Sequence, residues 1–256
     1  MKTLEESIKL FNDVKYFETH NDLEFFKRVY NEGDLKKYVN RLQAIGFYNK
    51  KLILDHGCGY GQWSFALSEI NEYVESYDIS ENRISIANRV KELISNKTVD
   101  FRSTIDYNDS RNFEKYDGIF SYGVLQCVDY REMLRNYYKF LKPGGRLYFT
   151  AADLGWFLYY IIDGHNDTID FSTRDWGIRA IENTISYNSS GNFIEGENIC
   201  IPYSSIVSEL ELLGFKLINI GPDGSTCLDE KLTTERFFPF EKYNYKAVYE
   251  VLCEKL

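Results

Sequence analysis

Apolar and polar residues alternate along the chain with two different periods. Short runs rich in β-branched and aromatic residues, typical of strands, are followed by stretches in which apolar residues recur every three or four positions, as in helices. The predicted strands are residues 52–55, 73–77, 97–102, 117–122, 146–151, 215–220 and 245–253. The predicted helices are residues 35–45, 63–70, 129–141 and 202–213, with a further one after Ser80. Strands that alternate with helices predict an α/β fold around a mostly parallel sheet.

One connection breaks this alternation. Residues 152–201 separate the fifth predicted strand from the next helix, and connections of this length usually carry structure and a function of their own. No internal repeat or low-complexity linker divides the chain, so we predict one domain over residues 1–256. Its predicted parts are an N-terminal helical cap (1–50), a core (51–151), the insertion (152–201) and the C-terminal part of the sheet (202–256).

The first predicted strand runs into a glycine-rich turn. Asp55 ends the apolar run, and Gly57, Gly59 and Gly61 follow at alternate positions before the next helix. Glycine at such a turn lets the backbone approach a ligand that a Cβ would keep away. The position at which a dinucleotide fingerprint has its third glycine or alanine is Gln62, which disfavours NAD. On this stretch alone, the alternative is a plain turn between a strand and a helix.

Four motifs together resemble the class I S-adenosylmethionine-dependent methyltransferases. They are residues 52–63, 77–80, 116–125 and 141–147, and they occur in the order and at the spacing of that family. The resemblance implies a doubly wound, mostly parallel, seven-stranded Rossmann-like sheet whose last strand is antiparallel. It also implies S-adenosyl-L-methionine as the cofactor and S-adenosyl-L-homocysteine as its product.

Residues at the ends of the predicted strands complete the predicted cofactor site. Asp78, at the end of the second strand, can accept hydrogen bonds from both hydroxyls of a ribose. Ser80 is better placed as the N-cap of the following helix. The resemblance implies that Ile105 and Asp106 hold the adenine and that Tyr122 faces the methyl group. The predicted cofactor-binding residues are Asp55, Gly57, Cys58, Gly59, Trp63, Asp78, Ile79, Ile105, Asp106, Ser121 and Tyr122.

The insertion is the predicted acceptor site, because it mixes aromatic side chains with polar and charged ones. His165 is a candidate general base, since a histidine pKa near 6.5 suits it to take a proton at neutral pH. The alternative for His165 is an ordinary solvated side chain, and Tyr122 is the second catalytic candidate. Aromatic residues of the cap, such as Tyr16, either belong to the core or help to cover the cofactor. The predicted substrate-binding residues are Tyr16, Gln126, Trp156, Tyr159, Tyr160, His165, Arg174 and Arg179.

Charge and cysteine content narrow the classes of partner. The chain has 39 acidic and 30 basic residues and no Lys/Arg-rich tract that could follow a phosphate backbone, so a nucleic-acid substrate is disfavoured. The five cysteines show no Cys-x-x-Cys spacing, so neither a zinc site nor a disulfide framework is predicted. No apolar run approaches the roughly 18 residues of a membrane span. We therefore expect a cytoplasmic protein without a metal site, whose aromatic N-terminal part either covers the cofactor or makes a homodimer contact.

These expectations converge on methyl transfer to an O or N atom of a small polar acceptor. The acidic charge and the insertion resemble methyltransferases that act on sugars or nucleotide-sugars of surface polysaccharide biosynthesis. One alternative is a non-catalytic cofactor-binding or scaffold subunit with the same fold. Another is a methyltransferase of tRNA or protein, although the Asn/Asp-Pro-Pro-Tyr type of sequence favoured by nucleic-acid amino methyltransferases is absent.

Overall fold

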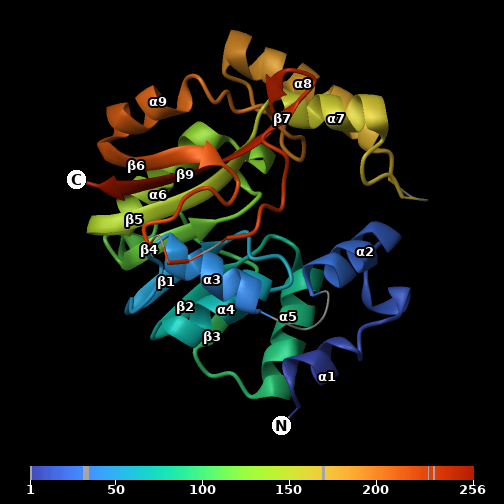
Figure 1. Ribbon diagram of the computed structural model, residues 1–256, viewed down its shortest axis with the longest axis vertical. Helices are drawn as coiled ribbons and strands as arrows, with labels where there is room; N and C mark the ends of the chain where they lie inside the picture. The colour runs from blue at the N-terminus through green and yellow to red at the C-terminus, as the bar shows by residue number, and fades with distance from the viewer. Residues whose placement is uncertain (1, 31–34, 169–170, 230, 233) are drawn as a thin grey trace.

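The computed structural model describes residues 2–30, 35–168, 171–229, 231–232 and 234–256. At its centre lies a seven-stranded sheet in the order β3-β2-β1-β4-β5-β9-β6 (Figure 1). The strands of this sheet are β1 (Leu52–His56), β2 (Tyr73–Tyr77), β3 (Val99–Arg102), β4 (Tyr116–Ser121), β5 (Leu141–Ala152), β6 (Phe215–Pro222) and β9 (Val248–Lys255). Neighbouring strands are parallel except at β9, which is antiparallel to both β5 and β6. This topology confirms the predicted fold, including its antiparallel last strand.

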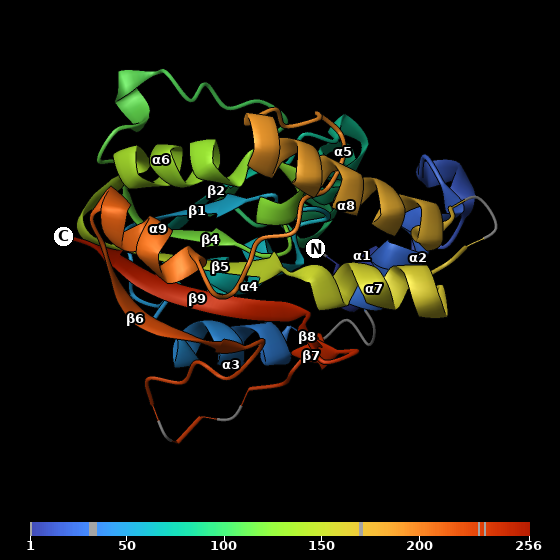
Figure 2. The same cartoon turned by 90° about the horizontal axis from the view of Figure 1, so that it is seen from above.

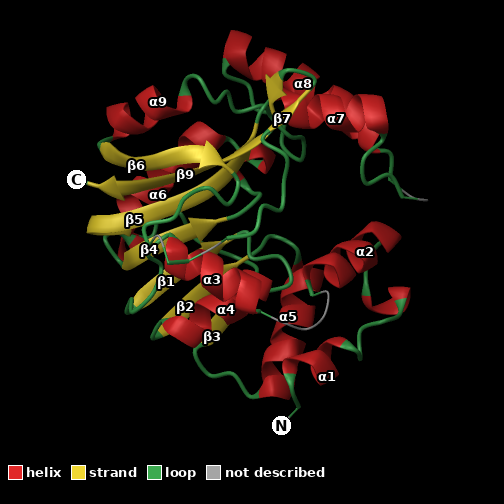
Figure 3. Ribbon diagram, viewed as in Figure 1, coloured by secondary structure: helices red, strands yellow, loops and turns green. Residues whose placement is uncertain are grey.

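Helices cover both faces of the sheet (Figures 2 and 3). The α-helices are α1 (Leu4–Ile8), α2 (His20–Val29), α3 (Lys36–Ala44), α4 (Gln62–Ile70), α5 (Glu81–Ile94), α6 (Tyr130–Phe140), α7 (Leu154–Asp163), α8 (Thr173–Ser190) and α9 (Ile206–Leu213). Successive strand residues point to opposite faces. Accordingly, Ile53 packs in one apolar cluster with α3, α4 and α5, while Leu54 packs in another with α6 and α9. The two helical layers therefore pack against opposite faces of the same sheet.

Local sequence explains where several helices begin and end. The hydroxyl of Ser80 accepts a hydrogen bond from the backbone N–H of Arg83, so the predicted N-cap of α5 is confirmed. Asp129 caps α6 in the same way. Helix α9 ends at Gly214, whose φ of +95° lies in the left-handed region that glycine adopts most easily.

The insertion after β5 consists mainly of two helices, α7 and α8. In Figure 1 the parallel strands point to the right, and both α7 and α2 lie beyond that edge of the sheet. The two regions touch directly, because Nη1 of Arg28, at the end of α2, lies 2.9 Å from Oδ1 of Asn166 in the segment after α7. The cap and the insertion therefore meet beside the carboxyl ends of the parallel strands, where sheets of this kind bind ligands.

Two predicted boundaries near the C-terminus are wrong. The helix expected from Pro202 begins at Ile206, because residues 202–205 form turns instead. The last strand was expected to start at Tyr245, but that residue belongs to a separate hairpin of β7 (Glu241–Lys242) and β8 (Tyr245–Lys246). Positive φ angles at both Tyr243 and Asn244 close this hairpin, as in the tight turns that match the twist of paired strands. An alternating apolar pattern does not reveal such a turn.

No helix within the described residues combines the length and the apolar character needed to cross a membrane.

Candidate functional site

The turn between β1 and α4 needs glycine for two reasons. Gly57, Gly59 and Gly61 all have positive φ angles, which other residues adopt only at a cost. A Cβ on Gly57 would lie 2.1 Å from Cγ2 of Val124, and a Cβ on Gly61 would lie 2.6 Å from Cζ of Phe101. Both sites are too crowded for any side chain. The backbone of this turn is therefore fixed close to the side chains of Val124 and Phe101.

Two buried carboxylates flank the glycine turn. Asp78 accepts hydrogen bonds from the backbone N–H of Gly59 at 2.8 Å and of Ser80 at 3.0 Å, one on each oxygen. Each oxygen keeps a second lone pair with which to accept a hydroxyl. Asp55 accepts a hydrogen bond from the Ser64 hydroxyl at 2.6 Å, and its burial raises its pKa to about 7. The turn, its helix and the next strand are thus tied to two acidic groups.

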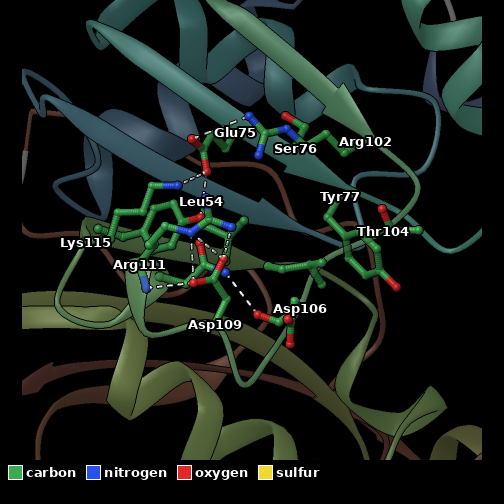
Figure 4. A pocket seen from close by; sticks show the side chains of 13 residues that line it. Leu54, Glu75, Ser76, Tyr77, Arg102, Thr104, Asp106, Asp109, Arg111 and Lys115 are labelled. Atoms are coloured by element: carbon green, nitrogen blue, oxygen red, sulfur yellow. Dashed lines mark hydrogen bonds and ion pairs between the residues drawn. The ribbon is translucent and has the colours of Figure 1, made fainter.

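The residues expected to hold the adenine follow two neighbouring strands, Ile79 after β2 and both Ile105 and Asp106 after β3. Ile79 is 79% exposed directly after the buried Asp78. Ile105 and Asp106 line a cavity of about 300 Å³ that Tyr77 and Thr104 border on one side and Lys115 and Arg111 on the other (Figure 4). On the far side, Lys115 forms an ion pair with Glu75, and Arg111 forms one with Asp109.

A chain of hydrogen bonds runs beneath the site. The two ring nitrogens of His56 lie 2.8 Å from the hydroxyls of Tyr107 and Tyr137, and the Tyr137 hydroxyl lies 2.9 Å from that of Ser121. Burial lowers the pKa of His56 to about 3, so this ring stays neutral. Ser121 is fully buried and its hydroxyl is engaged with Tyr137, so its side chain supports the end of β4 from below.

The side chain of Tyr122 does not suit the catalytic role predicted for it. Its hydroxyl donates a hydrogen bond of 2.8 Å to Oδ1 of Asp223. Burial and the Asp223 charge raise the pKa of Tyr122 well above 10, so the phenol stays protonated and cannot take a proton from an acceptor. The ring of Tyr122 nevertheless remains partly exposed. Tyr122 thus contributes a surface at the end of β4.

Five rings form a row of successive contacts, which we call the aromatic row. It consists of Tyr122, Phe238, Trp156, His165 and Tyr159. Its ring centroids are 5.9 Å apart from Tyr122 to Phe238, 5.4 Å from Phe238 to Trp156, 5.7 Å from Trp156 to His165 and 4.2 Å from His165 to Tyr159. The row leads from the end of β4 into the insertion, and all its members except Trp156 are partly exposed.

His165 lies inside this row. Its ring stacks on Tyr159, with an angle of 19° between the planes. Burial and the positive charges of Arg28 and Lys242 lower the pKa of His165, so its ring is neutral at pH 7. The unprotonated nitrogen of a neutral imidazole can accept a proton. The nearby Asp163 carboxylate accepts a hydrogen bond from the Tyr243 hydroxyl at 2.6 Å.

Residues 54–147 match a family model described as a methyltransferase domain. This match covers less than half of the chain, so it shows that this segment is similar to a methyltransferase domain. Its relatives include a demethylmenaquinone methyltransferase of Lactococcus lactis, 35% identical over 154 residues that cover 57% of this chain and 58% of the relative. They also include a ubiquinone biosynthesis O-methyltransferase of Proteus mirabilis, 25% identical over 141 residues that cover 53% of this chain and 57% of the relative. The matches span just over half the length of these curated relatives.

Among solved structures, the magnesium protoporphyrin IX methyltransferase of Synechocystis, crystallised with S-adenosylhomocysteine, has the same fold. It superposes with a TM-score of 0.55 and 17% sequence identity, and covers 98% of this chain and 100% of its own. At this identity the likeness shows the fold alone. The class I methyltransferase fold that the motifs predicted is therefore confirmed for the chain.

The two parts of the site relate differently to the methyltransferase domain. Every predicted cofactor residue, from Asp55 to Tyr122, lies inside the matched segment. The insertion and Phe238 lie outside it. The glycine turn and its carboxylates therefore belong to the matched segment, whereas most residues of the aromatic row lie outside it.

Several predicted site residues lie elsewhere or face the core. The Tyr16 ring packs on Phe11 in a groove between η1 (Val14–Tyr16) and α5, away from the aromatic row. Arg179 pairs with Glu197 at 2.9 Å, and Arg174 is exposed at the start of α8. Side chains that are buried include those of Cys58, Trp63 and Tyr160. Among the residues with a described placement, no three His, Cys, Asp or Glu side chains gather as metal ligands would.

Gln126 stays close to the predicted site. Its Nε2 donates to the carbonyl of Gly123 at 2.9 Å, and its buried Oε1 has no partner within the described part of the chain. No sequence pattern singles out His56 or Asp223, since each is bonded to partners far away in the chain. One local feature could have indicated Phe238, because Phe237 and Phe238 are two adjacent apolar residues in an otherwise polar segment.

Proposed function

We propose that the chain transfers a methyl group from S-adenosyl-L-methionine to an oxygen or nitrogen atom of a small molecule. One observation carries this proposal. The glycine turn, which has no room for side chains at Gly57 or Gly61, is hydrogen-bonded to the buried carboxylate of Asp78, with the exposed Ile79 beside it. An acidic group that keeps free lone pairs, next to a close backbone approach and an apolar surface, fits a nucleoside.

The residues divide the binding of this cofactor among them. Asp78 would accept the ribose hydroxyls, Asp55 the amino group, and Ile79 and Ile105 would pack against the adenine, with Asp106 near its edge. The sulfonium supplies a methyl group that is already activated. The chain's own contribution is to align the acceptor, to exclude water and to remove a proton. The rigid turn and the supported end of β4 favour alignment.

We assign His165 as the general base that takes the proton from the acceptor. A neutral imidazole in a partly buried position can accept a proton from an acceptor hydroxyl, and the stacked Tyr159 ring holds its plane. A purely solvated histidine would lack that stacking.

The aromatic row favours an acceptor with a planar ring. Flat unsaturated surfaces pack well against aromatic side chains. Among the matched proteins, three are named for demethylmenaquinone, ubiquinone biosynthesis and magnesium protoporphyrin IX, and another is named for phosphoethanolamine. A sugar would need a denser set of exposed polar groups than the row offers. We therefore propose a phenol, a hydroquinone or a similar ring as the acceptor, and retain sugars and nucleotide-sugars as the second class to test.

Calorimetric titration with S-adenosylhomocysteine tests the cofactor assignment. Wild-type protein should bind saturably, and Asp78→Ala should weaken binding by about 30-fold or more, because each hydrogen bond to a charged group contributes about 1.5–3 kcal/mol. Asp109→Ala is the matched control, since that carboxylate pairs with Arg111 at the far side of the neighbouring cavity. A folded wild-type protein that ignores S-adenosylhomocysteine would refute the assignment.

Acceptor classes are then compared by the S-adenosylhomocysteine they release from S-adenosylmethionine. Phenols and hydroquinones should give turnover, whereas nucleotide-sugars, amines and tRNA should not. Binding of the cofactor product without turnover on any class would favour the non-catalytic alternative.

A further inference from the structure

The segment after β6 takes part in the site although it follows the methyltransferase domain by many residues. Phe238 is the link between Tyr122 and Trp156 in the aromatic row. We infer that Phe238 contacts the acceptor ring and that the buried Arg41–Asp223 ion pair positions it beside Tyr122. This inference rests on the proposed function and adds residues that neither the motifs nor the family match include.

A single carboxylate holds both rings in place. Oδ1 of Asp223 accepts a hydrogen bond from the Tyr122 hydroxyl at 2.8 Å. Oδ2 accepts from the backbone N–H groups of Phe237 at 2.7 Å and of Phe238 at 3.1 Å. Because one rigid group accepts all three bonds, the position of the Phe238 backbone is set relative to the Tyr122 ring.

The Asp223 carboxylate is itself fixed by Arg41 of α3. Nη1 of Arg41 lies 2.7 Å from Asp223 Oδ1 and 3.5 Å from Glu250 Oε2, and all three side chains are fully buried. Nη2 of Arg41 donates to the carbonyl of Glu235, in the same segment as Phe238. A buried cation requires such partners, because an unpaired charge there is strongly disfavoured. The pair therefore ties the cap, the end of the sheet and the segment of Phe238 together.

The charges of this cluster do not face the acceptor. Asp223, Glu250 and Arg41 are all buried behind the aromatic row, and the surface they support is formed by the partly exposed rings of Tyr122 and Phe238. A polar network that has no exposed charge but fixes two rings side by side favours recognition of a flat, uncharged surface. The same arrangement would contribute little to a phosphate or a carboxylate.

The test uses hydroquinone, 1,4-dihydroxybenzene, as the probe, with the full chain saturated with S-adenosylhomocysteine. Saturation-transfer NMR of the ring protons reports binding, and titration gives the dissociation constant. Phe238→Ala should weaken hydroquinone binding by about 3- to 10-fold, the size expected for an aromatic contact. Calorimetry should show that the affinity for S-adenosylhomocysteine is retained. Phe238→Tyr should restore hydroquinone binding, since it keeps the ring.

A matched pair of variants tests the positioning role. Tyr122→Phe and Tyr148→Phe each remove one hydroxyl from the same buried cluster, where Tyr148 donates to Glu250 at 2.6 Å. Only Tyr122 is bonded to Asp223 and belongs to the row. We expect Tyr122→Phe to weaken hydroquinone binding about 3-fold at similar thermal stability, and Tyr148→Phe to leave it unchanged.

The outcomes separate this inference from the function on which it rests. Wild-type protein that does not bind S-adenosylhomocysteine overturns both. Wild-type protein that binds S-adenosylhomocysteine but gives no saturation transfer to hydroquinone overturns only the inference. Unchanged hydroquinone binding in Phe238→Ala, or equal effects of the two tyrosine variants, also overturns it.

Discussion

The proposed cofactor side and the proposed acceptor side of this site are built in opposite ways. On the cofactor side, Asp55, the glycine turn and Asp78 are supplied by one strand, one turn and the next strand, and they are bonded to near neighbours. On the acceptor side, Asp223 bonds to Tyr122 across 101 positions and to Arg41 across 182. The first region is local in the chain, whereas the second exists only after the whole chain has folded.

This difference is consistent with the extent of the family match, which includes the whole cofactor side but only Tyr122 of the aromatic row. A strand, a tight turn and a helix can be kept as one short unit in proteins whose remaining parts differ. The aromatic row instead depends on the insertion and on the segment after β6, so another protein can change its acceptor without changing the turn. The part of the chain that defines the fold is thus separate from the part that would select the acceptor.

The largest expected effect tests the dependence of the acceptor side on distant partners. Arg41→Met should lower the free energy of unfolding by about 3–5 kcal/mol, because it leaves two buried carboxylates without their cation. Urea denaturation measures it. Arg111→Met is the control, since Arg111 is an exposed partner of Asp109 and its loss should leave the free energy of unfolding nearly unchanged. Equal losses in the two variants would mean that the buried cluster has no special role.

The next effect tests the local construction of the cofactor side. Gly61→Ala should lower the free energy of unfolding by about 2–4 kcal/mol, because its positive φ is disfavoured and its Cβ would clash with Phe101. Gly144→Ala has a similar φ of +73° but no atom within 4 Å of the new Cβ. We therefore expect it to cost only about 1–2 kcal/mol. Thermal melts of both variants measure the difference, and the absence of any difference would contradict a crowded turn.

A third prediction uses pH to distinguish the two sides. Since burial raises the pKa of Asp55 to about 7, protonation below that pH should weaken S-adenosylhomocysteine binding, by up to about tenfold per pH unit. Calorimetry between pH 6 and 8 measures this dependence, and Asp55→Asn should abolish it. The pKa of His165 is lowered instead, by burial and by the charges of Arg28 and Lys242. Affinity that is flat in wild-type protein would argue against contact between Asp55 and the ligand.

Protonation of Asp55 should weaken ligand binding but stabilise the folded state. Between about pH 4 and 7 the folded state holds a proton on Asp55 that the unfolded state, with its ordinary pKa of 3.8, has lost. Its contribution to stability is therefore present at low pH and is lost as the pH rises through 7. Asp55→Asn should remove that part of the pH dependence of unfolding.

The smallest expected effect concerns the contact between the cap and the insertion. Arg28→Ala removes an exposed hydrogen bond to Asn166, so the free energy of unfolding should change by less than about 0.5 kcal/mol. Amide hydrogen exchange in the segment after α7 should nevertheless become faster. Lys27→Ala is the control, because Lys27 pairs with Glu24 inside α2. Equal exchange in both variants would show that Arg28 does not hold the insertion.

The parts of the fold that the sequence predicted are those with local causes. Ser80 caps α5 as expected, and the seven strands follow one another as the apolar runs indicate. The predictions that went wrong had competing local causes or distant ones. Tyr243 and Asn244 turn the chain where an alternating pattern suggested one strand. The hydroxyl of Tyr122 donates a hydrogen bond to Asp223, which lies far from Tyr122 in the sequence.

The sequence by itself determined the sheet, the glycine turn and the positions of Asp55 and Asp78, because hydrophobic period, positive φ and strand ends act over a few residues. Only the tertiary structure decided that Phe238 joins Trp156 to Tyr122, and that Arg41 is buried behind them. The physical reason is that a buried ion pair and a row of ring contacts depend on the distances between segments. Those distances are set by the packing of the whole molecule and leave no regular pattern along the chain.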